Sequence, residues 1–526
     1  MNKIFKVIWS KSKQCYIVVS EIAKNKTGKK KIVVAGIFAA LAMVNGGYST
    51  VAAALPGGVT GQNAMWIGNG ATVNGTIAGQ NSIAIGRNAN SKSAKSIAIG
   101  SDSVAEGVYI NPTTYTGATA VGAHTNASGA GATALGVSTS VKGDYSIGIG
   151  WNANVSTDNS IAIGVQTSSA KGGATAMGPS ARGYGEGALS LGYQALAGAD
   201  VYGSSINVNN NPSDDNTNTI NNYAKWGDAA IGLRAVATGG NATALGRSAR
   251  AAAANAIAIG GGNGNSATDN TEKTEATGEK ATAIGYNAKA GAEKSTAIGA
   301  SATANGLDSF AGASGTASGA ASVAIGKVSK ATDSSATAVG DGTSALGQGA
   351  TALGSNATAK NGFDLAVGRS VTSEGGAATV VGYNSNVKGN QSTGMGSGIN
   401  ITSQKATGIG YQVNVSGDNA IGIGSSGDST FVTASGASSI AMGTSAVANQ
   451  EKAIAIGANS KGTDIGATAL GRSSEATGAS ATALGSLASA TGTTATAVGM
   501  QASASGNDSL AIGTTASATS GRALAV

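Results

Sequence analysis

The sequence predicts an all-β fold, a parallel β-solenoid (β-roll) built from fourteen-residue turns. A pentapeptide recurs along the 526 residues, and its members alternate between large apolar and small side chains. The composition is poor in the side chains that fill an ordinary core, since aromatic residues make up only 4% and there are 83 glycines. Strict alternation predicts strands, and a short fixed period is typical of solenoid architectures.

The net charge of +7 belongs to one end of the chain. The first 54 residues hold nine lysines and one acid, Glu21, which leaves 24 basic and 25 acidic residues for the rest of the chain. A body of nearly zero net charge gives no support for nucleic-acid binding. The single cysteine, Cys15, also lies in this first part. The body therefore has neither disulfides nor thiolate-bound metal.

Residues 1–54 predict a cleaved signal peptide. A lysine cluster that ends at Lys31 precedes an apolar run over residues 32–44, and small residues follow up to Ala54. The apolar run is shorter than the roughly 20 residues that a membrane-spanning helix needs. This order of basic, apolar and small residues is typical of secretory signals, with cleavage near Ala54. A buried helix or an uncleaved anchor is the alternative.

The repeating pentapeptide is Ser-Ile-Ala-Ile-Gly at residues 82–86, and it returns fourteen residues later at 96–100. Its second and fourth residues lie on one face of a strand, and its first and third on the other. We expect the large face to fill the interior of the coil, with these core residues: Ile83, Ile85, Ile97, Ile99, Leu135, Ile161 and Ile163. The final glycine is expected to form a turn; examples are Gly86, Gly100, Gly136 and Gly164.

The second half of each repeat predicts a second strand with a weaker signal, because small residues recur three and five positions after the glycine. Two strands and two turns then make one coil, and stacked coils make two parallel sheets. Such a coil encloses a thin core, and the entropy cost of ordering its backbone is large. We therefore expect several copies of the chain to associate side by side, with the small third residue facing the neighbouring copy.

Four insertions interrupt the repeat, near residues 101–117, 201–227, 261–280 and 425–438. The longest carries Tyr202, Tyr223 and Trp226 among Asn and Asp residues. Loops on a rigid scaffold often carry function, and Tyr and Trp are favoured contact residues. These three aromatic residues are therefore candidate ligand contacts. Solvated loops whose aromatic side chains pack against the coil are the alternative.

The repeats of "NSIAIG", "ATALG" and "STAIG" type resemble the head of trimeric autotransporter adhesins, the YadA-like family. The stretch "MNKIFKVIWSKSKQCYIVVSEIAKNKTGKK" resembles the extended signal peptide of large proteins exported by type V secretion. The resemblance implies a left-handed β-roll over residues 55–526, a homotrimer, and display at the outer surface of a Gram-negative bacterium. It also implies binding to collagen, fibronectin, laminin or a host-cell receptor.

In some members of the family, copies of the Asn-Ser-Val-Ala-Ile-Gly kind are implicated in collagen binding. The positions that match this motif here, with Ile in place of Val, begin with Asn81 and Ser82 and with Asn159 and Ser160. The resemblance thus makes these four residues candidate ligand contacts. The family pattern also ends in a stalk and a C-terminal membrane anchor. The sequence up to Val526 has no sustained heptads and no terminal strand pattern of that kind, so we expect a fragment that reaches the outer membrane only through an anchor absent from this chain.

Enzyme chemistry finds little support. The one histidine, His124, has no second histidine for a metal pair and no defensible Ser/His/Asp set. We expect no cofactor and no metal. The hypothesis is therefore an adhesin head that binds host surfaces by non-covalent, multivalent contacts. The alternative is a structural surface fibre for autoaggregation and biofilm formation.

Overall fold

The computed structural model describes residues 64–73, 81–111, 114–198, 227–262, 272–426 and 430–526, together with the backbone of two strands near the N-terminus. The chain divides into two units, residues 1–60 and 61–526. In the first unit, β1 (Phe5–Ser10) and β2 (Cys15–Ser20) form an antiparallel pair.

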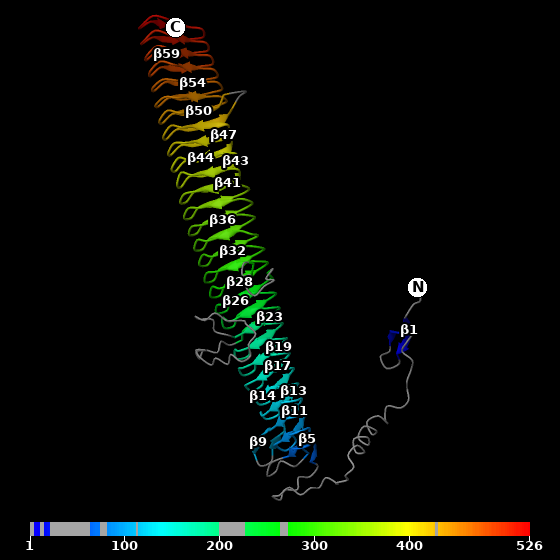
Figure 1. Cartoon of the computed structure of the whole chain (residues 1–526). Coiled ribbons are helices and arrows are strands. Elements are labelled where there is room, and N and C mark those ends of the chain that lie inside the picture. The colour runs from blue at the N-terminus through cyan, green and yellow to red at the C-terminus, as the bar shows by residue number, and fades with distance from the viewer. Residues whose placement is uncertain are drawn as a thin grey trace. The chain divides into compact units, whose positions relative to one another are not determined.

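The second unit is a parallel β-solenoid whose turns stack one on another along its length (Figure 1). Each turn has a first strand over the three residues before the motif glycine, from β3 (Met65–Ile67) to β61 (Leu510–Ile512). It has a second strand over the fourth and fifth residues after that glycine, from β4 (Thr72–Val73) to β62 (Ser517–Ala518). The predicted all-β solenoid of fourteen-residue turns is confirmed, while the handedness stays an expectation. The motif glycines are residues 68, 86, 100, 122, 136, 150, 164, 178, 192, 232, 246, 260, 285, 299, 326, 340, 354, 368, 382, 396, 410, 424, 443, 457, 471, 485, 499 and 513.

A few elements depart from this rule. Five first strands run two residues further than the rule. Five other strands differ in position or length because of nearby insertions or changes in the length of a turn. The longer strands are β41 (Leu365–Arg369), β43 (Thr379–Tyr383), β45 (Thr393–Ser397), β47 (Thr407–Tyr411) and β49 (Ile421–Ser425). The others are β28 (Glu275–Ala276), β33 (Phe310–Gly312), β48 (Val413–Val415), β50 (Val432–Ala434) and the final β63 (Leu524–Ala525). Between two turns the chain also forms an antiparallel hairpin of β9 (Val108–Asn111) and β10 (Thr114–Thr116).

Neighbouring turns pair in register, so that equivalent residues lie above one another. Ile83 pairs with Ile97, and Ala84 with Ala98. The same register continues through the first strands from β3 to β63 and through the second strands from β4 to β62. As a result, each position of the repeat becomes a continuous ladder along the solenoid.

The interior of the coil is made of small residues, which corrects the predicted core. The third residue of each pentapeptide, such as Ala84 or Ala98, is fully buried between the two sheets. The second and fourth residues point outward and are only half-buried. This holds for every residue predicted to form the core: Ile83, Ile85, Ile97, Ile99, Leu135, Ile161 and Ile163. The two faces of the strand were therefore assigned the wrong way round.

The reason is the small distance between the two sheets. Where the third residue is Gly148, the space that a methyl group would need is taken by Val141 of the second sheet, since an added Cβ would lie 2.6 Å from the valine Cγ2. Gly394 likewise faces Val387 at 2.6 Å. A glycine in the first sheet thus makes room for a large residue of the second sheet, whereas Val380 is a large buried third residue without such a glycine opposite it. An isoleucine in every turn would overfill this interior.

The motif glycines allow successive turns to approach closely. Gly164 has a φ of +141°, and a Cβ built there would lie 2.7 Å from the carbonyl oxygen of Gly178, the motif glycine of the next turn. The predicted turn glycines Gly86, Gly100 and Gly136 also have positive φ. A Cβ built on each of them would likewise lie close to the backbone of the next motif glycine. Both the positive φ at the end of the strand and the close backbone stacking favour glycine at these positions.

The compensating sizes in the interior can be tested by substitution. We predict that Gly148→Ala destabilises the solenoid by about 1–3 kcal/mol, because the new methyl group overlaps Val141. Combining it with Val141→Ala should recover part of this loss, which gives a coupling energy of about 1 kcal/mol or more between the two sites. Denaturant unfolding followed by circular dichroism measures both quantities.

Gly172→Ala is the matched control, because the nearest atom to a Cβ at this position lies 4.0 Å away and its φ is unremarkable. It should change stability by less than about 1 kcal/mol. Additive effects of the two interior substitutions would contradict the proposed compensation.

Candidate binding surfaces

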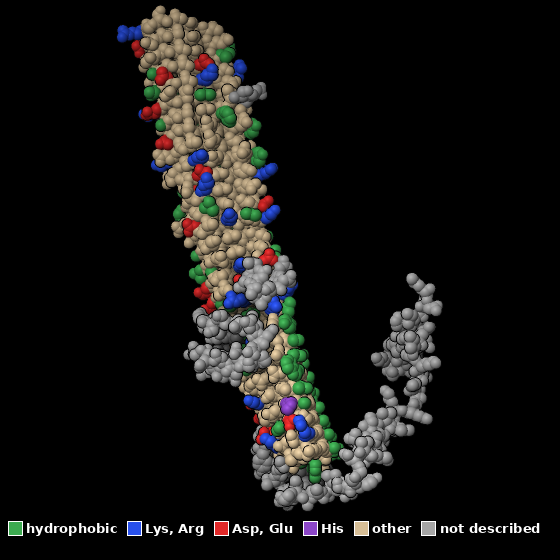
Figure 2. Space-filling view, viewed as in Figure 1, with side chains coloured by type: hydrophobic (Ala, Val, Ile, Leu, Met, Phe, Trp, Pro, Cys, Tyr) green, Lys and Arg blue, Asp and Glu red, His purple; other side chains and the backbone are tan. Residues whose placement is uncertain are grey.

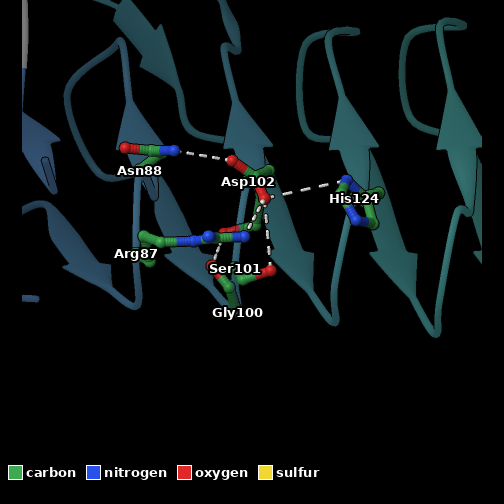
Figure 3. Close-up of polar contacts among 7 residues, drawn as sticks. Arg87, Asn88, Gly100, Ser101, Asp102 and His124 are labelled. Carbon is green, nitrogen blue, oxygen red and sulfur yellow. Dashed lines mark hydrogen bonds and ion pairs between the residues drawn. The ribbon is translucent and has the colours of Figure 1, made fainter. Parts of the chain in front are cut away.

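The loop that follows the first strand exposes polar side chains, and some of them contact side chains at similar positions in the neighbouring coils. Figure 3 shows three successive turns, with Asp102 between Asn88 and His124. Asn88 donates a hydrogen bond of 2.8 Å to one carboxylate oxygen of Asp102. The other oxygen lies 3.4 Å from the Arg87 guanidinium and 3.8 Å from Nδ1 of His124. These groups are open to solvent, and their contacts join three successive turns.

Asp102 is held in its ionised form. The hydrogen bond from Asn88 is the largest cause that lowers the pKa of Asp102 below its ordinary value of 3.8, with smaller contributions from Ser101, Arg87 and His124. His124 is the single histidine of the chain. Among the described residues, no group of three or more His, Cys, Asp or Glu side chains could hold a metal ion.

The outer face of the second sheet carries charged pairs that join equivalent positions of adjacent turns. Lys92 and Glu106 lie 3.4 Å apart, and Lys461 and Glu475 lie 2.8 Å apart. Such exposed pairs contribute about 0–1 kcal/mol each and weaken in salt. This face therefore resembles the polar surface of a soluble protein.

The outer face of the first sheet carries a row of large apolar side chains by contrast, at the fourth position of the pentapeptide, beside a row of isoleucine, leucine or threonine at the second. We call it the ladder face; it consists of the second and fourth residues of every pentapeptide, stacked in register from β3 to β63. Many of its Ile, Leu and Met side chains keep a large exposed fraction, such as 43% for Ile298 and 45% for Met395. Figure 2 shows hydrophobic side chains running along one edge of the solenoid, most densely in its N-terminal half. Exposed apolar rows of this length are typical of interaction surfaces.

A further row borders the ladder face. It consists of the residue that follows each motif glycine, and we call it the glycine-following row. In six successive turns all of its members are apolar or aromatic, and all are exposed: Val137, Trp151, Val165, Pro179, Tyr193 and Leu233. Trp151 has 51% of its surface exposed and Tyr193 has 42%. We call these six residues the apolar stretch.

The residues that the sequence predicts as ligand contacts differ in their exposure to solvent. Ser82 and Ser160 are fully buried, and their hydroxyls donate hydrogen bonds to the carbonyl oxygens of Ser93 and Lys171. They stabilise the coil and cannot reach a ligand, because they lie on the interior face with the alanines. That part of the prediction is wrong. Asn81 and Asn159 are exposed in turns with φ near +57° and stay candidates.

Tyr202, Tyr223 and Trp226 lie outside the described residues. The glycine-following row was not recognised from the sequence as a surface. The signal was nevertheless present, since aromatic residues recur at one position of the repeat: Trp151, Tyr193, Tyr286, Tyr383 and Tyr411. A residue type that repeats at one position of a solenoid forms a ladder in space.

Two family models match the chain. The extended signal peptide of the type V secretion system matches residues 1–47. The YadA head domain repeat matches over more than half of the chain, in overlapping stretches at residues 78–107, 116–139, 142–167, 230–263, 276–302, 290–311, 317–343, 338–359, 345–370, 434–460, 465–488, 490–516 and 504–526. No curated protein matches the chain significantly. Within the described part of the second unit, no helix is long and apolar enough to cross a membrane.

The contacts of Asp102 predict a local dependence of stability on pH. Because its pKa is lowered in the folded state, the ionised carboxylate stabilises the turn above pH 3.8, and this contribution is lost as the pH falls through the folded pKa. We predict that Asp102→Asn speeds hydrogen exchange in the turns around residues 88–124 at pH 7. The difference from wild type should disappear at strongly acidic pH, where the wild-type residue is also neutral.

Exchange followed by mass spectrometry, with both proteins compared at each pH, measures this effect. Asn88→Ala serves as a second variant, because it removes the main hydrogen-bond donor and should shrink the same difference. A gap between wild type and Asp102→Asn that stays constant down to pH 2 would contradict the assignment.

Proposed function

Because the chain belongs to the YadA-like family of trimeric autotransporter adhesins, we propose that its solenoid is an adhesin head that attaches a bacterium to host cells or extracellular-matrix proteins. The chain is exported to the cell surface of a Gram-negative bacterium. The family is non-enzymatic, and the solvent-exposed polar contacts of the turns agree with a binding role. Binding is non-covalent and multivalent, since one surface recurs turn after turn.

We infer that the ladder face is the surface on which three copies meet. Its fourth residues are Ile, Leu, Val or Met in nearly every turn, although threonine often occupies the second position, and exposing these large apolar side chains to water is unfavourable. Covering the remaining surface of one half-exposed isoleucine is worth about 1 kcal/mol. Repeated over the stacked turns, this gain exceeds the cost of association. The lateral association expected from the sequence then occurs through the large residues rather than through the small ones.

The apolar stretch supports a contact with another protein. It runs over six adjacent turns between Val137 and Leu233 at the border of the ladder face. Exposed apolar rows of this kind mark protein interaction sites, and Trp and Tyr are the residues that most often dominate binding energy. We propose that matrix proteins such as collagen, fibronectin or laminin, or a host-cell receptor, dock here. A fibre for autoaggregation is the alternative outcome.

The trimer can be tested by cross-linking. In a Cys15→Ser background, we predict that Ile298→Cys on the ladder face forms intermolecular disulfides on mild oxidation, because equivalent side chains of the copies meet there. Thr303→Cys, on the outer face of the second sheet, is the matched control and should stay reduced. Light scattering should give three times the mass of one chain. A monomer of full β-sheet content, or cross-linking only at Thr303→Cys, would rule out this arrangement.

The adhesive role can be tested on bacteria that display the whole chain. We predict that Trp151→Ser combined with Tyr193→Ser lowers adherence to the preferred matrix protein or host cell about tenfold or more, because both side chains supply exposed contact area. Tyr286→Ser, in the same row but outside the apolar stretch, should leave adherence unchanged.

Adherence to immobilised collagen, fibronectin and laminin and to cultured host cells is the measurement. If wild-type bacteria bind none of these surfaces but clump with each other, the fibre alternative replaces the adhesin proposal. If the double variant remains trimeric and adheres like wild type, the apolar stretch is not the docking site.

A further inference from the structure

The solenoid changes its local structure between β41 and β49 (Figure 1). Only here, within the described residues, do five consecutive first strands extend to five residues, so that they include the motif glycine and the residue after it. The matches to the YadA head repeat end at residue 370 and resume at 434. The segment that departs from the family repeat in sequence thus also departs from it in structure.

The longer strands bring the glycine-following row into the sheet. The ladder pairs Arg369 with Tyr383, Tyr383 with Ser397, Ser397 with Tyr411, and Tyr411 with Ser425. Pairing in register fixes the spacing of these residues, because adjacent strands of a sheet lie about 4.8 Å apart. The two tyrosines are therefore separated by about 10 Å along the solenoid axis, with one serine between them.

Both tyrosines are exposed and one is oriented by a cation. Tyr383 and Tyr411 each have 51% of their surface exposed. The guanidinium carbon of Arg369 lies 5.9 Å from the centre of the Tyr383 ring, a cation–π contact that restricts the ring. Two rings on a regular backbone ladder form a more rigid surface than aromatic residues on a loop would.

The neighbours of the two tyrosines are small or neutral and polar. The turn between them reads Gly396-Ser397-Gly398, which leaves room between the two rings. The residues next to the rings along the chain are Asn384 and Gln412, and Asn384 is exposed. Among residues 369–370, 383–384, 397–398, 411–412 and 425–426, Arg369 is the one charged residue.

We propose that Tyr383 and Tyr411 form a platform for a linear polysaccharide that lies along the solenoid axis, an inference that rests on the proposed adhesin function. The C–H faces of pyranose rings pack on aromatic rings, and their hydroxyls pair with amide and hydroxyl side chains such as Asn384, Ser397 and Gln412. A polymer with a fixed repeat matches two rings at a fixed spacing.

The size of the platform favours a polysaccharide over a folded protein. A stable protein interface takes about 800 Å² from each partner and roughly 20–30 residues a side. Here two large side chains are separated by Ser397 and followed along the chain by amides, and the ladder face on their other side is assigned to the contact between copies. The platform also differs from the apolar stretch, where six consecutive members of the same row are apolar. The two surfaces therefore suit ligands of different chemistry.

The experiment measures binding of the purified whole chain to immobilised β-(1→4)-linked N-acetylglucosamine oligomers, cello-oligomers and hyaluronan oligomers of four to eight sugars. These probes share an extended chain and differ in charge and substituents. The variants are Tyr383→Ala with Tyr411→Ala, and Tyr383→Phe with Tyr411→Phe. Tyr286→Ala is the matched control, because it removes a tyrosine of the same row that has no second tyrosine two turns away.

We expect wild type to bind at least one oligomer series. The double alanine variant should lose about tenfold or more in affinity, the double phenylalanine variant should keep most of it, and Tyr286→Ala should bind like wild type. Each variant is checked for unchanged mass by light scattering and unchanged circular dichroism.

Three results would overturn the proposal. The first two are no binding of wild type to any sugar oligomer, and equal binding by the double alanine variant. The third is loss of the protein trimer in that variant, which would assign the tyrosines to the contact between copies. The adherence assay with Trp151 and Tyr193 is read separately. Failure of the polysaccharide platform therefore leaves the adhesin proposal standing, and failure of adherence to protein surfaces does not by itself remove sugar binding.

Discussion

The distance between the two sheets of one coil is the constraint on which the rest of this structure depends. A turn of fourteen residues with strands of three and two residues closes so tightly that the interior accepts little more than methyl groups. In most turns alanine therefore occupies the third position and serine or alanine the first, with Asp228 and Asp364 as buried exceptions at the first position. Where glycine replaces alanine, as at Gly408, the opposite sheet fills the space with Ile399 and Ile401. Interior volume, rather than hydrophobicity alone, selects these residues.

This constraint moves the large apolar side chains outward. A single coil buries mainly methyl groups, and burial of methyl groups offsets little of the entropy cost of ordering fourteen residues. The stack gains stability from the in-register ladders, from the close approach of the motif glycines and from whatever covers the ladder face. The apolar exterior and the narrow interior are thus two consequences of one geometry, and together they are the physical basis for the proposed association of copies.

The sequence determined the period, the parallel strands and the turn glycines, because these follow from local spacing. It could not decide which face of the strand was inside, since alternation alone treats the two faces alike. Hydrophobicity favoured Ile83 and Ile85 as core, whereas volume excluded them. The decisive signal was a coupling across half a turn, glycine at 148 against valine at 141 and 155. The same reversal buried Ser82 and Ser160, which removed them from the candidate contacts.

In-register stacking also determines how such a protein can recognise anything. One substitution on the exterior changes one rung, and a recognition surface arises only when the same position is changed in several nearby turns. The glycine-following row shows two such patterns. It holds consecutive apolar residues from Val137 to Leu233, and tyrosines in alternate turns at positions 383 and 411. A solenoid without deep interior space is suited to recognising ligands that extend along its axis, through the order and spacing of the side chains on its outer surface. Extended ligands, or repeated contacts with one partner, fit such a surface better than small molecules that require enclosure.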